Sequence, residues 1–131
     1  MREIKFRAWL KRDKRMLPVK SIIFETNRVS VRLRERLWVS TEFDEIELMQ
    51  FTGLKDKNGK EIFEGDIIKC SDGHDYYFGV VAYDKDYGNF GVIEDNDEDM
   101  DPFGYLFEWK NVEELEVVGN KYENPELLKG E

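Results

Sequence analysis

The residues best suited to catalysis are a histidine and a cysteine near the middle of the chain. His74 is the single histidine and lies between Asp72 and Asp75, as a general base with an adjacent carboxylate would. Cys70, the single cysteine, precedes it by four residues. A Cys–His pair also needs an orienting third group and an oxyanion hole, and no motif supplies them. We therefore expect His74 to be a solvated loop residue and Cys70 to be a small buried hydrophobic residue.

Acidic residues form two groups that are candidates for a divalent-cation site. Residues 94–101 hold six acids in eight positions, three of which have the spacing of calcium-loop ligands: Asp95, Asp97 and Asp99. However, Met100 stands where such a loop needs glycine, and Leu106 stands where it needs glutamate. The second group surrounds two predicted turns: Glu61, Glu64 and Asp66. Nothing else typical of metal-dependent phosphoryl chemistry accompanies it. We expect solvated loop and turn acids in both places, with no metal, no cofactor and no catalytic residue.

Charge is distributed unevenly along the 131 residues. Residues 1–36 contain 12 Lys/Arg and 4 Asp/Glu, a net charge of +8. Residues 37–131 contain 8 Lys/Arg and 25 Asp/Glu, a net charge of −17. Such asymmetry indicates an electrostatic partner, which is another part of the same molecule, another copy of it, or a different molecule.

Cations and aromatic rings alternate in the basic part, which is a pattern found in nucleic-acid-binding strands. Cations bind phosphates there and rings stack on bases. The candidate nucleic-acid-binding residues are Lys5, Arg7, Trp9, Arg32 and Arg34. The −17 of the remaining chain would repel a polyanion, so we favour self-association over nucleic-acid binding. A third hypothesis is that the acidic part mimics nucleic acid and binds a basic site on a host protein.

Period-two patterns predict that strands position these residues. Within residues 4–10, Ile4, Phe6 and Ala8 fall on one face, opposite the face that carries the cations and Trp9. Residues 28–33 alternate in the same way, with apolar Val29 and Val31 on one face. Further extended segments are expected at residues 16–24, 37–39 and 43–50, the last of them running into Phe51.

The second half of the sequence predicts a small barrel. A loop is expected at residues 52–54, and turns are expected at Asn58-Gly59 and around Gly65. Strands follow at residues 66–70, 76–83, 89–94, 105–109 and 115–118. A helical turn capped by Asn111 precedes the last strand, and residues 124–130 suit a short helix with a proline in its first turn. Five short strands with one helical turn before the last is the element order of an SH3-like barrel.

Three segments carry a resemblance to a known family. They are the opening IKFRAW at residues 4–9, the central LMQFTGLKDKNGKEIFEGDIIK at residues 48–69, and the closing VVGNKYENPELL at residues 117–128. With these motifs the sequence resembles the YopX family of small phage and prophage proteins. The resemblance implies a phage-type origin and an SH3-like barrel in the C-terminal part. It implies no established activity, so it assigns no catalytic residues.

Together these patterns predict a mainly β protein. We expect a basic N-terminal β (α+β) subdomain at residues 1–50, an SH3-like β-barrel at residues 51–122 with a connector at 51–65, and a short helix or tail at residues 123–131. The expected function is that of a non-enzymatic accessory protein that binds proteins and forms a homo-oligomer. No run of 18 apolar residues and no signal-peptide core occurs, so we expect no membrane association and a location in the host cytoplasm.

Overall fold

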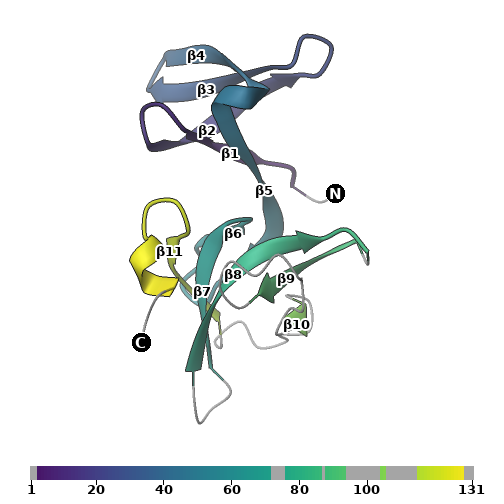
Figure 1. The fold of residues 1–131 in the computed structure, drawn as a ribbon, viewed down its shortest axis with the longest axis vertical. Coiled ribbons are helices and arrows are strands. Elements are labelled where there is room, and N and C mark those ends of the chain that lie inside the picture. The colour runs from purple at the N-terminus through teal and green to yellow at the C-terminus, as the bar shows by residue number, and fades with distance from the viewer. Residues whose placement is uncertain (1–2, 72–75, 87, 94–103, 106–114, 129–131) are drawn as a thin grey trace. The chain divides into compact units, whose positions relative to one another are not determined.

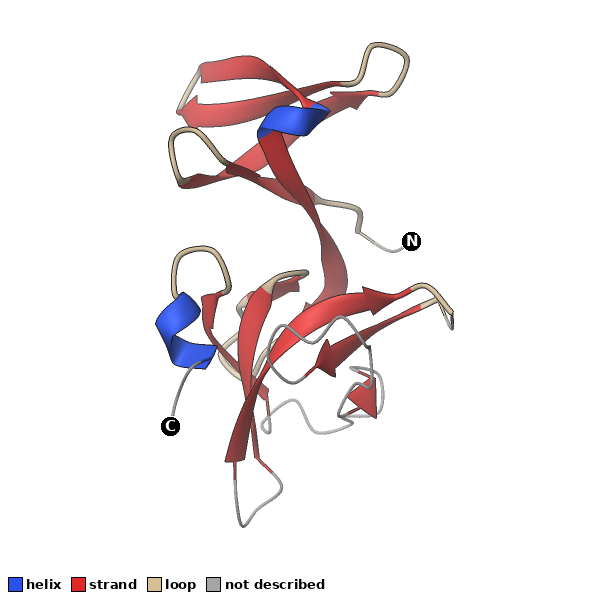
Figure 2. Ribbon diagram, in the orientation of Figure 1, coloured by secondary structure: helices blue, strands red, loops and turns tan. Residues whose placement is uncertain are grey.

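The computed structural model describes residues 3–71, 76–86, 88–93, 104–105 and 115–128 (Figure 1). The described chain is mainly β, as predicted, and its strands form two antiparallel sheets (Figure 2). The chain divides into two compact units, Met1–Phe51 and Thr52–Glu131. The strands of the first sheet are β1 Phe6–Leu10, β2 Arg15–Ile23, β3 Arg28–Arg34, β4 Leu37–Glu42, β5 Ile46–Lys55 and β6 Glu61–Phe63. Those of the second are β7 Asp66–Ser71, β8 Tyr76–Asp84, β9 Asn89–Ile93, β10 Gly104–Tyr105 and β11 Leu115–Asn120.

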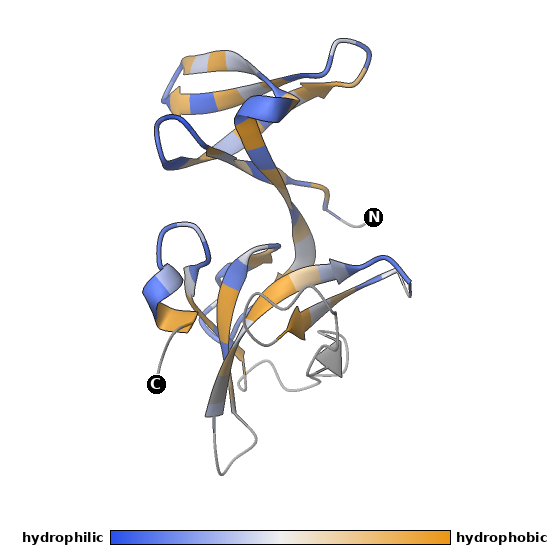
Figure 3. Cartoon of the chain, viewed as in Figure 1, coloured by the Kyte–Doolittle hydropathy of each residue, from blue (hydrophilic) through white to orange (hydrophobic). Residues whose placement is uncertain are grey.

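The N-terminal unit is a meander in which β4, β3, β2 and β1 lie side by side in that order, with β5 next to β1. Alternate residues of these strands face one core, and Figure 3 shows apolar and polar residues alternating along β3 and β4. Its buried members are Ala8, Leu10, Leu17, Val29, Val31 and Ile46. The predicted apolar faces of residues 4–10 and 28–33 are therefore confirmed, except that Ile4 is exposed.

The end of β4 departs from the predicted strand at residues 43–50. Phe43–Glu45 form one turn of 3-10 helix, η1, and the extended chain begins only at Ile46. A capping box closes this turn, because the Glu42 backbone N–H donates to Glu45 Oε1 at 2.7 Å and the Glu42 side chain accepts an N–H from Glu45. The N-terminal unit thus has the element order β1, β2, β3, β4, η1, β5, with the 3-10 turn directly before the fifth strand.

The predicted loop at residues 52–54 is wrong, because β5 continues to Lys55. The Thr52 hydroxyl donates to the Ile62 carbonyl at 2.7 Å and thereby ties β5 to β6. The predicted turns are confirmed, since Gly59 and Gly65 adopt φ of 81° and 84°, where glycine is favoured.

The second sheet has the order β10, β9, β8, β7, β11. β7 pairs with a strand on each side: Ile68 lies opposite Gly79 of β8 and opposite Val117 of β11. The core of this unit contains Ile62, Ile68, Cys70, Val81, Val92, Leu115 and Val117. Most of the predicted strand at residues 105–109 and the helical turn at Asn111 lie outside the described residues.

Asp56 joins the first turn of the C-terminal unit to its last strand. Its side chain is buried, and Oδ1 accepts the backbone N–H groups of Asn58 at 2.8 Å and Lys60 at 2.9 Å. Oδ2 accepts the N–H of Val117 at 2.8 Å. Burial raises the pKa of the Asp56 carboxyl, but the three N–H donors and the Lys60 charge lower it, and the net pKa lies below its ordinary value. The carboxylate is therefore a structural anion.

Residues 120–124 form a second network of polar contacts. Asn120 Oδ1 accepts the N–H groups of Tyr122 and Glu123, and Asn124 Oδ1 accepts the N–H of Asn120 at 3.2 Å. The predicted tail helix is the 3-10 helix η4, Pro125–Leu128. Of the two helical turns in the described parts of the chain, neither is long and apolar enough to cross a membrane.

Candidate binding surface

A cation–aromatic cluster lies on the polar face of β2, β3 and β4. The Nζ atom of Lys20 is 3.5 Å from the centre of the Trp38 ring, and the Cζ atom of Arg32 is 5.9 Å from it. Both distances are within the range of cation–π attraction. The Trp38 residue is 40% exposed, so the cluster faces solvent within its unit. The arrangement presents two cations beside one ring and can bind an anionic group such as a phosphate or a carboxylate.

The strand register brings these three residues together. Val31 lies opposite both Val19 and Val39 and is fully buried, so the next residue of β3, Arg32, points to the other face, where it lies opposite Trp38. The register between β2 and β3 shifts between Val19 and Ser21. Lys20 is the residue inserted by this bulge, and its ammonium group is placed over the Trp38 ring.

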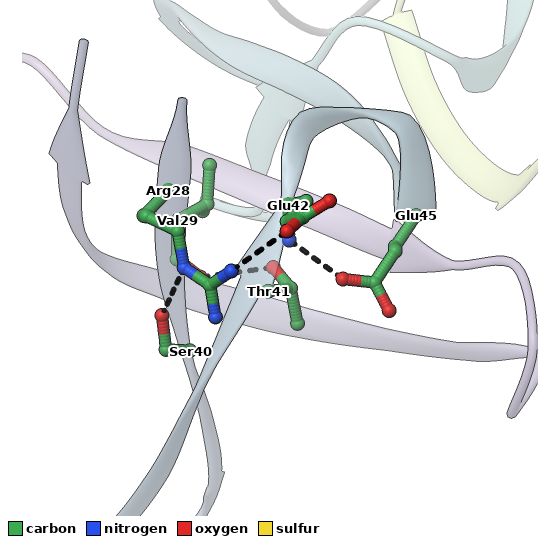
Figure 4. A network of polar contacts seen from close by, with 6 residues as sticks. All are labelled: Arg28, Val29, Ser40, Thr41, Glu42 and Glu45. Carbon is green, nitrogen blue, oxygen red and sulfur yellow. Dashed lines mark hydrogen bonds and ion pairs between the residues drawn. The ribbon is translucent and has the colours of Figure 1, made fainter. Parts of the chain in front are cut away.

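Arg28 lies on the same strand as Arg32 but is already paired (Figure 4). Its Nε donates to Ser40 Oγ and its Nη1 to Glu42 Oε1, each at 3.0 Å. Thr41 faces the core and donates its hydroxyl hydrogen to the Val29 carbonyl at 2.9 Å. The Arg28 charge is thus balanced locally, which leaves Lys20 and Arg32 as the cations that define the cluster.

The residues predicted to bind nucleic acid lie on two strands that β2 separates. Lys5, Arg7 and Trp9 precede or belong to β1 and are half-buried; the Lys5 ammonium lies 3.2 Å from Glu3 Oε2 and 5.5 Å from the centre of the Phe51 ring. Arg32 belongs to the cluster. Arg34 lies beyond a shift of register and is opposite Leu37 rather than Trp38. The structure thus brings only Arg32 of the five into the cluster.

Sequence reasoning missed two members of the cluster, Lys20 and Trp38. Trp38 follows the two-residue turn at Glu35-Arg36, which by itself would place Trp38 opposite Leu33; a shift of register between Arg32 and Arg34 places it opposite Arg32 instead. Lys20 likewise carried no signal in the sequence. Its position depends on a bulge, which has no fixed sequence pattern here.

Exposed apolar side chains gather at the β2–β3 turn and η1. Phe24 is 73% exposed, and its ring makes an edge-to-face contact with Phe43 at a centroid distance of 6.4 Å. Phe43 is 36% exposed, and its N–H donates to the Asn27 carbonyl, which fixes η1 against the turn. Two rings held in this way form an apolar surface at this end of the N-terminal unit.

The remaining candidate residues have structural explanations. In the described part of the chain, carboxylates come within 4.8 Å of one another in one group of three, Glu42, Asp44 and Glu45, and all three residues are exposed. Glu42 and Glu45 already bind Arg28 and the backbone, so the capping box accounts for their positions. Of the second predicted acid group, Asp66 is buried and its Oδ2 accepts the N–H of Phe63 at 2.8 Å.

Cys70 is fully buried in the core of the C-terminal unit, which confirms the prediction that it is a small hydrophobic residue. Burial raises the pKa of its thiol to about 11, so the nucleophilic thiolate is suppressed. His74 and the acidic segment at residues 94–101 lie outside the described residues.

Comparisons with known proteins place this chain in a structural context. A family model described as YopX protein matches residues 5–129. No curated protein matches the sequence. The chain is similar to protein EF1440 from Enterococcus faecalis, whose crystal structure has a TM-score of 0.63 and 30% sequence identity over 98% of this chain and 99% of that one.

Proposed function

The chain belongs to the YopX family, and on that premise we propose that it is a non-enzymatic protein of phage or prophage origin that acts by binding, with copies of itself as its first partner. The chemistry of the buried polar residues supports the non-enzymatic part. Among the described residues, Asp56, Asn120 and Thr52 use their side-chain atoms to hold turns and strands together. The buried thiol of Cys70 has a raised pKa, which is unfavourable for a nucleophile. The proposed location is the host cytoplasm.

The observation that carries self-association is the exposed aromatic pair, Phe24 and Phe43. Covering apolar surface is favourable by about 25 cal/mol per Å², so an association in which a second copy covers these rings is stabilised by each of them. Charge supports the same proposal. The N-terminal unit has 12 basic and 8 acidic residues, a net charge of +4, whereas the C-terminal unit has 8 and 21, a net charge of −13. Opposite charges within one chain attract copies of that chain to one another.

The molar mass in solution tests this proposal. Light scattering coupled to size exclusion measures it at micromolar concentration and from about 0.05 M to about 1 M salt. The molar mass should be a multiple of 15.6 kDa at low salt and should fall at high salt, because the charges are then screened. Phe24→Ser should weaken association. Tyr76→Ser is the matched control, because Tyr76 is also exposed and also makes an edge-to-face contact, with Phe78. A monomer at every salt concentration would refute self-association.

The cation–aromatic cluster favours nucleic-acid binding as a second candidate function. The Lys20 ammonium lies over the Trp38 ring, so the cations would meet a nucleic acid before the ring could stack on a base. Binding through phosphates is independent of sequence and weakens steeply with salt. Fluorescence anisotropy with single- and double-stranded probes should therefore show salt-sensitive binding that Arg32→Glu reduces and Arg12→Glu, an exposed control in the β1–β2 turn, reduces less. Equal affinities for the two variants would remove this candidate.

We also propose that both units are small curled sheets of the SH3-like type. For the N-terminal unit the support is the succession of four strands, the 3-10 turn η1 and a fifth strand, with β2 bent by a bulge at Lys20. For the C-terminal unit the support is the antiparallel order of β10, β9, β8, β7 and β11. In the C-terminal unit, nuclear Overhauser contacts between residues of β10 and β11, the two end strands of that order, would establish the closure of the sheet.

A further inference from the structure

We propose that two copies associate through β4, which pairs antiparallel with β4 of the second copy about a twofold axis. This inference rests on the self-association proposed above and specifies its contact. β4 forms one end of the sheet order, and β3 is its neighbour among the described strands. Its sequence, LWVSTE, contains neither lysine nor proline, the residues with which natural edge strands avoid pairing.

The hydrogen-bonding groups of β4 that point away from β3 follow from the cap of η1. The Glu42 N–H donates to Glu45 Oε1 and is therefore turned away from the ladder with β3. Phe43, by contrast, donates its backbone N–H to the Asn27 carbonyl at 3.2 Å, so its backbone groups and those of Thr41, two residues earlier, face β3. Backbone groups alternate in direction along an antiparallel strand, so those of Ser40 and Trp38 point outward together with Glu42. Two residues, Trp38 and Ser40, thus offer both an N–H and a C=O to a new strand.

These directions fix the register. Outward-pointing residues must face each other to exchange hydrogen bonds, so Trp38 lies opposite Ser40 of the second copy, and Ser40 lies opposite Trp38. Val39 then lies on the twofold axis. A register centred on Ser40 would place Trp38 opposite Glu42, whose N–H is already bound to Glu45. The contact is isologous and closes as a dimer.

The charges next to β4 complement each other in this register. Arg36 directly precedes β4, and Glu42 is its last residue. Antiparallel pairing about Val39 therefore brings Arg36 near Glu42 of the second copy, and the axis repeats this pair. A parallel pairing would bring like charges together instead. Electrostatic complementarity of this kind fixes register and suppresses wrong pairings.

The same register uses exposed apolar residues. Leu37 and Phe43 lie near opposite ends of β4, and both are at least partly exposed. Antiparallel pairing makes Leu37 a diagonal neighbour of Phe43 in the second copy, a separation that large side chains bridge. The Phe24 ring, which contacts Phe43, extends that surface. The dimer thus covers part of the apolar surface on which the proposed function rests.

A charge exchange between Arg36 and Glu42 tests this contact. By analytical ultracentrifugation of the full chain, Arg36→Glu should raise the dimer dissociation constant about tenfold or more, because it places like charges near one another at both ends of the contact. Adding Glu42→Lys to Arg36→Glu should return the constant to within about threefold of the wild-type value. Arg12→Glu makes the same charge change in the β1–β2 turn and should leave the constant unchanged.

Ser40→Pro provides the second test, because proline removes an outward N–H while the ladder to β3 keeps its donors. It should give a monomer with a wild-type circular dichroism spectrum; if the variant is unfolded, the charge exchange decides. A wild-type dimer that neither the proline nor the charge exchange affects would overturn the β4 contact and leave self-association standing. A wild-type monomer at all salt concentrations would overturn both.

Discussion

Replacing Asp56 by asparagine should destabilise the C-terminal unit through three backbone hydrogen bonds. Asparagine retains one oxygen, which can still accept the N–H groups of Asn58 and Lys60. Its NH₂ group then faces the N–H of Val117, so a buried donor loses its acceptor. An orphaned buried N–H costs about 1–3 kcal/mol, and each remaining bond weakens by about 1 kcal/mol without the charge. Relief from burying that charge offsets part of this, so we expect a loss of about 2–4 kcal/mol.

The effect depends on pH in a defined direction. The pKa of the Asp56 carboxyl in the folded protein lies below its ordinary value of about 3.9 in an unfolded chain. The stabilisation by the carboxylate is therefore complete above about pH 4 and is lost as the pH falls through the folded-state pKa. The difference in unfolding free energy between wild type and Asp56→Asn should accordingly shrink in acid.

Urea unfolding followed by circular dichroism measures the free energies, and amide hydrogen exchange measures protection at Val117. The control is Asp86→Asn, because Asp86 is exposed in the β8–β9 turn and should change stability by less than about 0.5 kcal/mol. The account of Asp56 is refuted if its asparagine variant unfolds with wild-type free energy and an equally protected Val117 amide. If the difference in unfolding free energy between wild type and Asp56→Asn stays constant from neutral pH into acid, the hydrogen bonds keep their proposed role but the negative charge does not.

Three further predictions concern single side chains. Gly119→Ala should cost about 1–3 kcal/mol in thermal unfolding, because a Cβ there would lie 2.6 Å from Asn124 Oδ1; unchanged stability would show that Asn124 moves aside freely. Thr52→Val should cost about 1–2 kcal/mol by removing the hydroxyl donor to the Ile62 carbonyl, and urea unfolding would contradict this if the midpoint did not fall. Cys70 should resist a thiol reagent near pH 8 until the protein is denatured, because burial raises its pKa to about 11; rapid labelling of the native protein would disprove its burial.

Period-two patterns predicted the strands well because they reflect the pleat directly. Ala8, Val29 and Val31 are buried where the alternation placed them. The predicted strand over Phe43–Glu45 was wrong because glutamate is not a common N-cap residue, so the reciprocal bonds between Glu42 and Glu45 left no familiar signature. The predicted loop at Thr52 was wrong because β5 is extended by a hairpin partner, β6, that local sequence does not reveal.

The polar features were harder to predict than the core. Asp56 lies in a segment that reads as a solvated turn, and its distant partner is a backbone N–H, which every residue except proline carries. The contact between Lys20 and Trp38 depends on an inserted residue in β2 and on the register between β3 and β4. Both features arise from long-range geometry, which composition and spacing do not specify.

The bond between Asp56 and Val117 has a consequence for the order in which the chain folds during translation. The two residues are 61 positions apart in the sequence, and β7 likewise pairs with the distant strand β11. By contrast, every strand of the N-terminal unit begins before residue 52. Synthesis proceeds from the N-terminus, so the ribosome releases a complete first unit long before the second can close. Until β11 emerges, β7 lacks one neighbour and Ile68 lacks its opposite residue, Val117. A message truncated before this point would yield a product with an ordered first unit and an open second one, a ready substrate for cellular proteases.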